Sequence, residues 1–221
     1  MIPIFDLDDT LYPEINFVQS GFCAVAKELE KIYQWPVEDS MTIMNEVLVS
    51  QGRGAVFDRL LEVHKQINKA NIKRCIDIYR HHVPKIELPK STKEVLLGLH
   101  RKPYLVTDGH KVVQANKVKA LNLDKYFKKI YLTNRYGIKN AKPSLHCFDL
   151  IRKQEKCRWE DMYYVGDNPD KDFVNLNKVG VITIRIKAGV HSNKIAKDGF
   201  EARYIIDALS DLKKLEEFKI E

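Results

Sequence analysis

The first part of the chain shows two patterns of hydrophobic residues, one typical of a strand and then one typical of helices. Residues 2–6 (IPIFD) form a short apolar run typical of a buried strand, with proline near its start, where a missing N–H is tolerated. From about residue 16 to about residue 83, apolar positions recur at helical spacing. One stripe in this part holds Phe17, Phe22, Val25, Leu29 and Ile32. The pattern predicts a block of about four helices, whose later members fall in 39–50, 55–67 and 69–83.

Beyond residue 86, apolar runs of strand length alternate with amphipathic segments of helix length. The predicted strands are 102–109, 128–134, 161–167 and 181–186. The predicted helices are 91–100, 111–123, 144–154 and 173–180. Segment 202–207 is typical of a last edge strand, and a polar C-terminal helix is expected after it. Strands that alternate with helices predict an α/β fold with a doubly wound, mainly parallel sheet.

The first strand belongs to this alternating part, although the helical block separates it from the other strands. An insertion after the first strand explains the arrangement. We therefore predict a core formed by residues 1–14 and 86–221, and a small all-helical domain formed by residues 15–85.

The charge balance narrows the class of partner. The chain has 37 Lys and Arg residues against 30 Asp and Glu residues, a net charge of +7 that suits an anionic partner. The basic residues are spread along the chain, without a compact basic arm or the aromatic signature of RNA-binding domains. A small phosphorylated molecule is therefore favoured over nucleic acid.

The sequence also carries indications of location. The four cysteines are scattered and form no CxxC pair, which is typical of free thiols in a reducing compartment. No basic segment followed by a long apolar stretch opens the chain, and no run of about 18 apolar residues exists. We predict a cytoplasmic protein that does not bind membranes; the pattern indicates no particular oligomeric state.

Polar clusters follow three of the predicted strands. They are Asp6-Leu7-Asp8-Asp9-Thr10, Thr107-Asp108-Gly109 and the segment 166–172 (GDNPDKD). If the strands are parallel, these clusters meet at one edge of the sheet. A fourth segment, NAKPS, places Lys142 at the start of a helix.

Each of these residues has a plainer interpretation when taken alone. Asp8, Asp9 and Thr10 could cap a helix, Thr107 could be an ordinary strand residue, and Lys142 could be a surface lysine. Asp170 is best explained as a solvated loop residue. The ordered occurrence of all four segments argues against coincidence.

The four segments resemble the motifs of the haloacid dehalogenase superfamily of phosphohydrolases. DLDDT matches the DxDxT motif, VTDG the second motif, KPS the third and GDNPDKD the fourth, and the resemblance covers essentially the whole chain. It implies a Rossmann-like three-layer core of this superfamily. The helical insertion resembles the caps of the branch whose caps are helical bundles.

The resemblance implies a Mg²⁺-dependent phosphatase. Asp6 and Asp167 would supply carboxylates to the metal, and Asp8 its backbone carbonyl, because hard Mg²⁺ prefers oxygen ligands. Asp6 would attack phosphorus and form an aspartyl-phosphate. The side chain of Asp8 would protonate the leaving oxygen and later activate the hydrolytic water.

Other residues would hold the phosphate. Thr107 and the N–H groups of Asp108 and Gly109 would bind phosphoryl oxygens, and Lys142 would contact both nucleophile and phosphate. Asp172 would hold metal-bound water or orient Lys142.

Two further residues are candidates for substrate contact. Arg53 lies between glycines in the QGRG loop of the helical insertion, and its guanidinium suits phosphate or carboxylate groups. Tyr12 lies beside the first motif, where the chain leaves for the insertion. An exposed loop between helices is the alternative for Arg53.

The superfamily resemblance leaves several reactions open. Dehalogenases lack the acid two residues after the nucleophile, so Asp8 favours phosphoryl transfer to water. A phosphomutase or other phosphotransferase is the second candidate. A non-catalytic binding protein is the third, although every reactive position is filled. We predict hydrolysis of a small phosphomonoester, such as a sugar, polyol, amino-alcohol or nucleoside monophosphate.

Overall fold

The structure is a computed structural model that describes residues 1–215. The described chain divides into two compact units, one formed by residues 1–14 with the described residues from 87 onward and the other by residues 15–86. Each unit has its own buried core. Among the described residues, no helix combines the length and apolar composition needed to cross a membrane.

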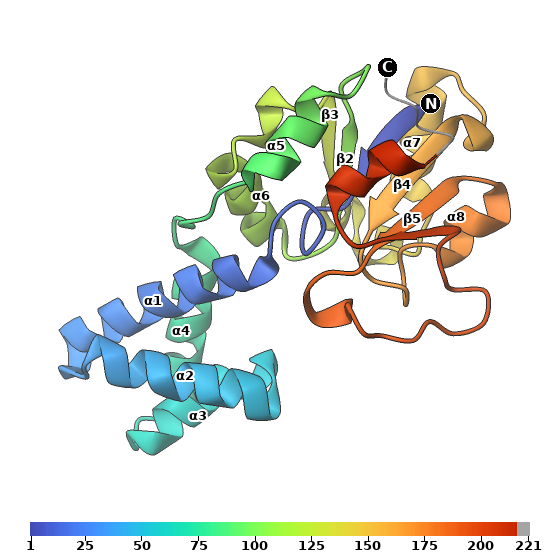
Figure 1. The fold of residues 1–221 in the computed structure, drawn as a ribbon. Helices are drawn as coiled ribbons and strands as arrows, with labels where there is room; N and C mark the ends of the chain where they lie inside the picture. Colours follow the sequence, from blue (N-terminus) through green and yellow to red (C-terminus); the bar gives the residue numbers. More distant parts are fainter. Residues whose placement is uncertain (216–221) are drawn as a thin grey trace. The chain divides into compact units, whose positions relative to one another are not determined.

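The first unit is built on a six-stranded sheet with the order β3-β2-β1-β4-β5-β6, in which every neighbouring pair runs parallel (Figure 1). The strands are β1 (Ile2–Phe5), β2 (Tyr104–Thr107), β3 (Lys129–Leu132), β4 (Met162–Gly166), β5 (Ile182–Ile186) and β6 (Tyr204–Ile206). β1, β2, β4 and β5 are buried along their whole length, as expected for strands covered on both faces. The predicted α/β fold with a parallel sheet is confirmed.

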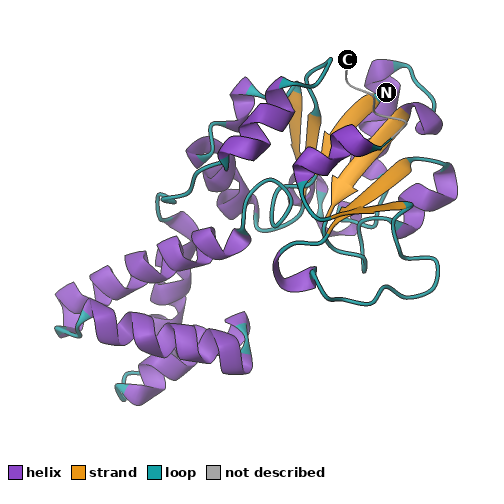
Figure 2. Cartoon of the chain, in the orientation of Figure 1, coloured by secondary structure: helices purple, strands orange, loops and turns teal. Residues whose placement is uncertain are grey.

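Helices flank this sheet (Figure 2). They are α5 (Lys90–Leu97), α6 (Lys111–Ala120), α7 (His146–Glu155) and α8 (Val174–Val179). Short 3₁₀ helices lie in the segments between and after these elements: η2 (Leu123–Lys125), η3 (Thr133–Tyr136), η4 (Ile138–Asn140), η5 (Trp159–Asp161), η6 (Gly189–His191) and η7 (Leu209–Lys214). The predicted polar C-terminal helix is a 3₁₀ helix over Leu209–Lys214, and the rest of it, residues 216–221, lies outside the described residues.

The second unit contains helices only. They are α1 (Glu14–Tyr33), α2 (Val37–Gln51), η1 (Arg53–Ala55), α3 (Val56–Val63) and α4 (Lys69–His81). Their common core includes Phe22, Val25 and Leu29 from the predicted stripe. The prediction for Ile32 is wrong, because this residue is 41% exposed. Four residues after Leu29 the stripe continues at Tyr33, which packs against the core instead.

Candidate active site

The carboxyl ends of β1, β2 and β4 bring three predicted motifs to one edge of the sheet. Asp6 follows β1, Thr107 ends β2 and Asp167 follows β4. β1 lies between the other two strands, and the backbone N–H of Asp6 donates to the carbonyl of Val165 in β4 at 2.8 Å. The topology therefore holds Asp6 between the two neighbouring strand ends.

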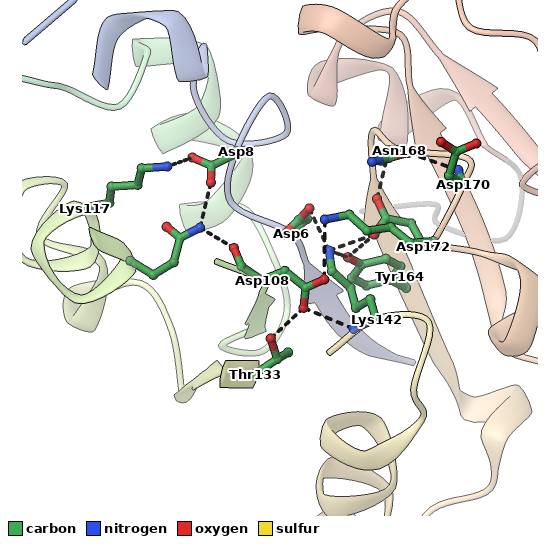
Figure 3. Close-up of polar contacts among 12 residues, drawn as sticks. Asp6, Asp8, Asp108, Lys117, Thr133, Lys142, Tyr164, Asn168, Asp170 and Asp172 are labelled. Carbon is green, nitrogen blue, oxygen red and sulfur yellow. Dashed lines mark hydrogen bonds and ion pairs between the residues drawn. The ribbon is translucent and has the colours of Figure 1, made fainter. Parts of the chain in front are cut away.

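Lys142 lies between two carboxylates of this edge. Its ammonium contacts Asp6 Oδ2 at 2.8 Å and Asp172 Oδ1 at 2.7 Å, and donates to the Tyr164 hydroxyl at 2.9 Å (Figure 3). The side chain is 1% exposed, so its three N–H donors need protein acceptors, and these three contacts supply them. α7 begins only at His146, so Lys142 lies in the turn before the helix and not at its start.

The charges of this cluster are unevenly compensated. Burial disfavours the ammonium of Lys142, but Asp172 and Asp6 outweigh it and hold its pKa well above the ordinary value. Burial raises the pKa of Asp6; Lys142 opposes the rise and Asp172 adds to it. Burial also raises the pKa of Asp167, where the carboxylates of Asp6 and Asp172 increase the effect. Lys142 contacts two of the three buried carboxylates, Asp6 and Asp172, and its single positive charge leaves excess negative charge in the cluster.

The same carboxylates fit a divalent cation. One oxygen from each of Asp6, Asp167 and Asp172 lies within 4.8 Å of the other two. Asp6 Oδ1 is buried without a hydrogen-bond partner among the described residues, which is costly for a carboxylate oxygen. Asp172 differs, since Lys142 and the backbone N–H of Asn168 (2.9 Å) engage both of its oxygens. Asp6 and Asp167 therefore fit a hard cation such as Mg²⁺, with Asp172 occupied by Lys142.

Two glycines of the motifs are required by their surroundings. A β-carbon on Gly166 would lie 2.6 Å from Asp172 Oδ2, so only glycine lets the Asp172 carboxylate pack against the end of β4. Gly109 has φ +136°, and the amide nitrogen of Gln114 lies 2.7 Å from where its β-carbon would be. Both glycines allow a functional loop to approach its neighbour closely.

The second and third motifs meet directly. Thr107 is buried at the end of β2, and Asp108 and Gly109 follow it. The backbone N–H of Lys142 donates to Asp108 Oδ1 at 3.2 Å. The predicted phosphate-binding residues are thus brought together at the edge that carries Asp6.

Asp8 makes its contacts apart from this cluster. Its Oδ1 accepts hydrogen bonds from Lys117 Nζ at 2.7 Å and from the Tyr12 hydroxyl at 2.9 Å, and its Oδ2 accepts one from Gln114 Nε2 at 2.8 Å. Figure 3 shows its carboxylate turned toward Lys117. Lys117 is itself buried and also contacts Glu14 at 3.2 Å. Donors from α6 and from Tyr12 therefore fix the Asp8 side chain.

Sequence reasoning missed Lys117 and Gln114. They lie three residues apart on α6 and so share a helix face, and they are the buried residues of that helix. Two polar residues at core-facing positions were the available signal. The hydrophobic pattern alone could not show that this face meets a carboxylate.

The two substrate candidates occupy different surroundings. Tyr12 is buried, with its hydroxyl on Asp8. Arg53 begins η1 of the helical unit and is exposed. Contact of either residue with substrate stays a prediction.

Known proteins share this sequence pattern. The model of the family "haloacid dehalogenase-like hydrolase" matches residues 3–186. A glyceraldehyde 3-phosphate phosphatase of Methanocaldococcus jannaschii is 29% identical over 219 residues, covering 95% of this chain and 93% of the relative. A protein of the same name from Methanopyrus kandleri is 22% identical and covers 86% and 85%. The predicted class of enzyme, a phosphatase of this superfamily, is confirmed.

Solved structures share the fold at low sequence identity. The HAD-hydrolase YfnB of Bacillus subtilis bound to magnesium has a TM-score of 0.66 and 17% identity, covering 96% of both chains. The 2-haloacid dehalogenase of Pseudomonas syringae has a TM-score of 0.63 and 21% identity, covering 97% of both chains. The four motifs, the parallel sheet that brings them together and the family match over most of the chain agree. The chain belongs to the haloacid dehalogenase-like hydrolases.

Proposed function

We propose that this protein hydrolyses a small phosphomonoester with Mg²⁺ as cofactor, through an aspartyl-phosphate on Asp6. One observation carries the proposal: Lys142 holds Oδ2 of the buried Asp6 carboxylate, whose Oδ1 has no hydrogen-bond partner among the described residues. A buried carboxylate that a neighbouring ammonium orients suits nucleophilic attack. Asp6 and Asp167 would hold Mg²⁺, whose charge would offset the negative charge of the carboxylates and of the phosphate.

The chain's own residues account for each bond. A carboxylate oxygen of Asp6 attacks phosphorus, and the bond from phosphorus to the leaving alcohol breaks. Asp8 gives a proton to that alcohol; for this step its side chain has to leave Lys117 and Gln114. Water then attacks the phosphorus of the aspartyl-phosphate, Asp8 takes a proton from it, and inorganic phosphate leaves as Asp6 is regenerated. Lys142 would keep the Asp6 carboxylate oriented throughout, and its positive charge would attract the phosphoryl group.

The relatives suggest where to look for the substrate. The two curated relatives described above are named glyceraldehyde 3-phosphate phosphatases. We propose a three-carbon phosphate of this kind as the first substrate to test, before sugar phosphates, polyol or amino-alcohol phosphates and nucleoside monophosphates. The helical unit of residues 15–86 would act as a cap that selects among them.

Removal of the metal tests the function. With 4-nitrophenyl phosphate and glyceraldehyde 3-phosphate, turnover is expected to fall at least about 100-fold in EDTA and to return with Mg²⁺, because an anionic nucleophile must approach an anionic ester. Phosphate release is the measurement. Full activity in EDTA would contradict the metal-dependent route. A protein that hydrolyses no phosphomonoester in Mg²⁺ would contradict the function itself.

Arg53→Ala tests the proposed cap. If the guanidinium binds substrate but takes no part in bond cleavage, KM is expected to rise about 10-fold while kcat changes less than about 2-fold. Arg59→Ala is the matched control, since Arg59 is an exposed arginine of the same unit, paired with Glu62. Equal kinetics in both variants and the parent would remove Arg53 from the substrate site.

A further inference from the structure

The carboxylate of Asp108 joins several loops around the site. Its Oδ1 accepts hydrogen bonds from Thr133 Oγ1 at 2.6 Å and from the backbone N–H of Lys142 at 3.2 Å. Its Oδ2 lies 3.4 Å from the ammonium of Lys171. Figure 3 shows the Asp108 side chain between Thr133 and Lys142. One side chain thus connects the end of β2 with segments after β3, before α7 and after β4.

Water reaches little of this network. Thr133 is buried, and the Asp108 side chain is 13% exposed. Burial opposes the charge of Asp108, but Lys142 and Lys171 outweigh it and lower its pKa. Asp108 is therefore a carboxylate at neutral pH and accepts charge-assisted hydrogen bonds, which are the stronger kind.

Lys171 differs from Lys142 in how its charge is compensated. Lys142 has carboxylate oxygens of Asp6 and Asp172 within 2.8 Å. Lys171 has Asp108 at 3.4 Å, and its side chain is 34% exposed. Lys171 is also among the charged groups that act on the Asp6 carboxyl. Its ammonium therefore lies within electrostatic reach of the proposed nucleophile and is less fully compensated.

We propose that Asp108 is a positioning residue, which holds the ammonium of Lys171 and the main chain of Lys142 where both face the substrate's phosphate group. The inference rests on the proposed phosphatase function. A phosphate monoester brings negative charge to a site that already holds Asp6 and Asp167, and a second ammonium beside Lys142 offsets part of the repulsion. The alternative is an ordinary surface ion pair, which contributes little and leaves substrate binding unaffected.

Variants of the pair separate these alternatives. Asp108→Asn keeps the size and one acceptor but removes the charge that holds Lys171, and Lys171→Met removes the ammonium. Each is expected to lower kcat/KM for 4-nitrophenyl phosphate and to weaken inhibition by inorganic phosphate, both about 10-fold. Lys171→Arg keeps the charge and is expected to retain most of the parent's phosphate affinity. Lys119→Met, an exposed lysine of α6, is the control.

The double variant tests whether Asp108 acts through Lys171. If it does, Asp108→Asn changes phosphate inhibition by less than about 2-fold once Lys171 is Met, because the group it positions is gone. Thr133→Val, which removes only the hydroxyl donor, is expected to lower the melting temperature. If Asp108 had only a structural role, Asp108→Asn would also lower the melting temperature, but it would leave inhibition by phosphate unchanged. Independent effects that multiply in the double variant, or parent-like kinetics in both single variants, would overturn the inference.

Phosphate binding also separates this inference from the proposed function. Calorimetry with inorganic phosphate is run on the parent and on every variant, beside the turnover assay. If the parent hydrolyses esters and both Asp108→Asn and Lys171→Met behave like the parent, the inference is wrong and the proposed function stands. If the parent binds phosphate through Lys171 but hydrolyses no ester, the proposed function is wrong and the inference about Lys171 stands. A parent that neither binds phosphate nor turns over overturns both.

Discussion

Asp6→Asn is expected to lower kcat at least about 1,000-fold, which corresponds to about 4 kcal/mol of lost transition-state stabilisation. An amide is a poor nucleophile, so the aspartyl-phosphate would not form. The fold should persist, because asparagine has nearly the volume of aspartate and burial already disfavours the Asp6 charge, as its raised pKa indicates. Turnover of glyceraldehyde 3-phosphate and 4-nitrophenyl phosphate in Mg²⁺ is the measurement.

Two comparisons make this result specific. Asp124→Asn makes the same chemical change at an exposed position in η2 and is expected to retain parent activity. When the parent protein is mixed with substrate labelled in its phosphate and then quenched in acid, it should carry label on Asp6. The Asp6→Asn variant treated in the same way should carry none. A variant that keeps even about a tenth of the parent rate would contradict covalent catalysis by Asp6.

The parallel sheet and the residues at its edge were predictable because each rests on a local pattern. Asp6, Thr107 and Asp167 each stand where a buried apolar run ends. In a parallel sheet such ends lie on the same edge, whatever the order of the strands. The order itself, which places β1 between β2 and β4, was not readable from the periodicity. The resemblance to a known superfamily predicted that these strand ends form one site.

The contacts of Asp8 and Asp108 were not predictable, because they depend on which side chains become buried together. Lys117 looks like a surface lysine in the sequence, yet its side chain is 2% exposed beside Asp8. Asp108 was expected to act through its backbone N–H, whereas its side chain contacts Thr133, Lys142 and Lys171. No local period encodes the pairing of Asp8 with Lys117 or of Asp108 with Thr133, Lys142 and Lys171, since these partners are far apart along the sequence and meet only in the folded chain.

Lys142 and the three carboxylates form a single electrostatic unit. The ammonium stabilises Asp6 and Asp172, and these carboxylates in turn raise the pKa of Lys142 despite its burial. Structure and proposed chemistry therefore depend on the same contacts. A substitution of Lys142 should affect stability as well as catalysis, whereas a substitution of Asp6 should affect mainly catalysis.

Lys142→Met is expected to abolish turnover and to lower the free energy of unfolding by about 3 kcal/mol, because removing one partner leaves buried carboxylates without compensation. The side chains of Lys142 and Asp172 are 1% and 0% exposed, so water cannot replace the lost ammonium. Urea unfolding in EDTA, followed by circular dichroism, gives the stability. EDTA is needed because a bound cation would stabilise the carboxylates and hide part of the loss.

Two variants give this prediction its controls. Lys139→Met removes an exposed lysine from η4, close in sequence, and is expected to leave the free energy of unfolding within about 0.5 kcal/mol of the parent. Adding Asp172→Asn to Lys142→Met removes one of the uncompensated charges, so the double variant is expected to be more stable than Lys142→Met alone. If Lys142→Met unfolds at the parent's urea concentration, the ammonium does not hold these carboxylates together, and the charge balance proposed for the site is wrong.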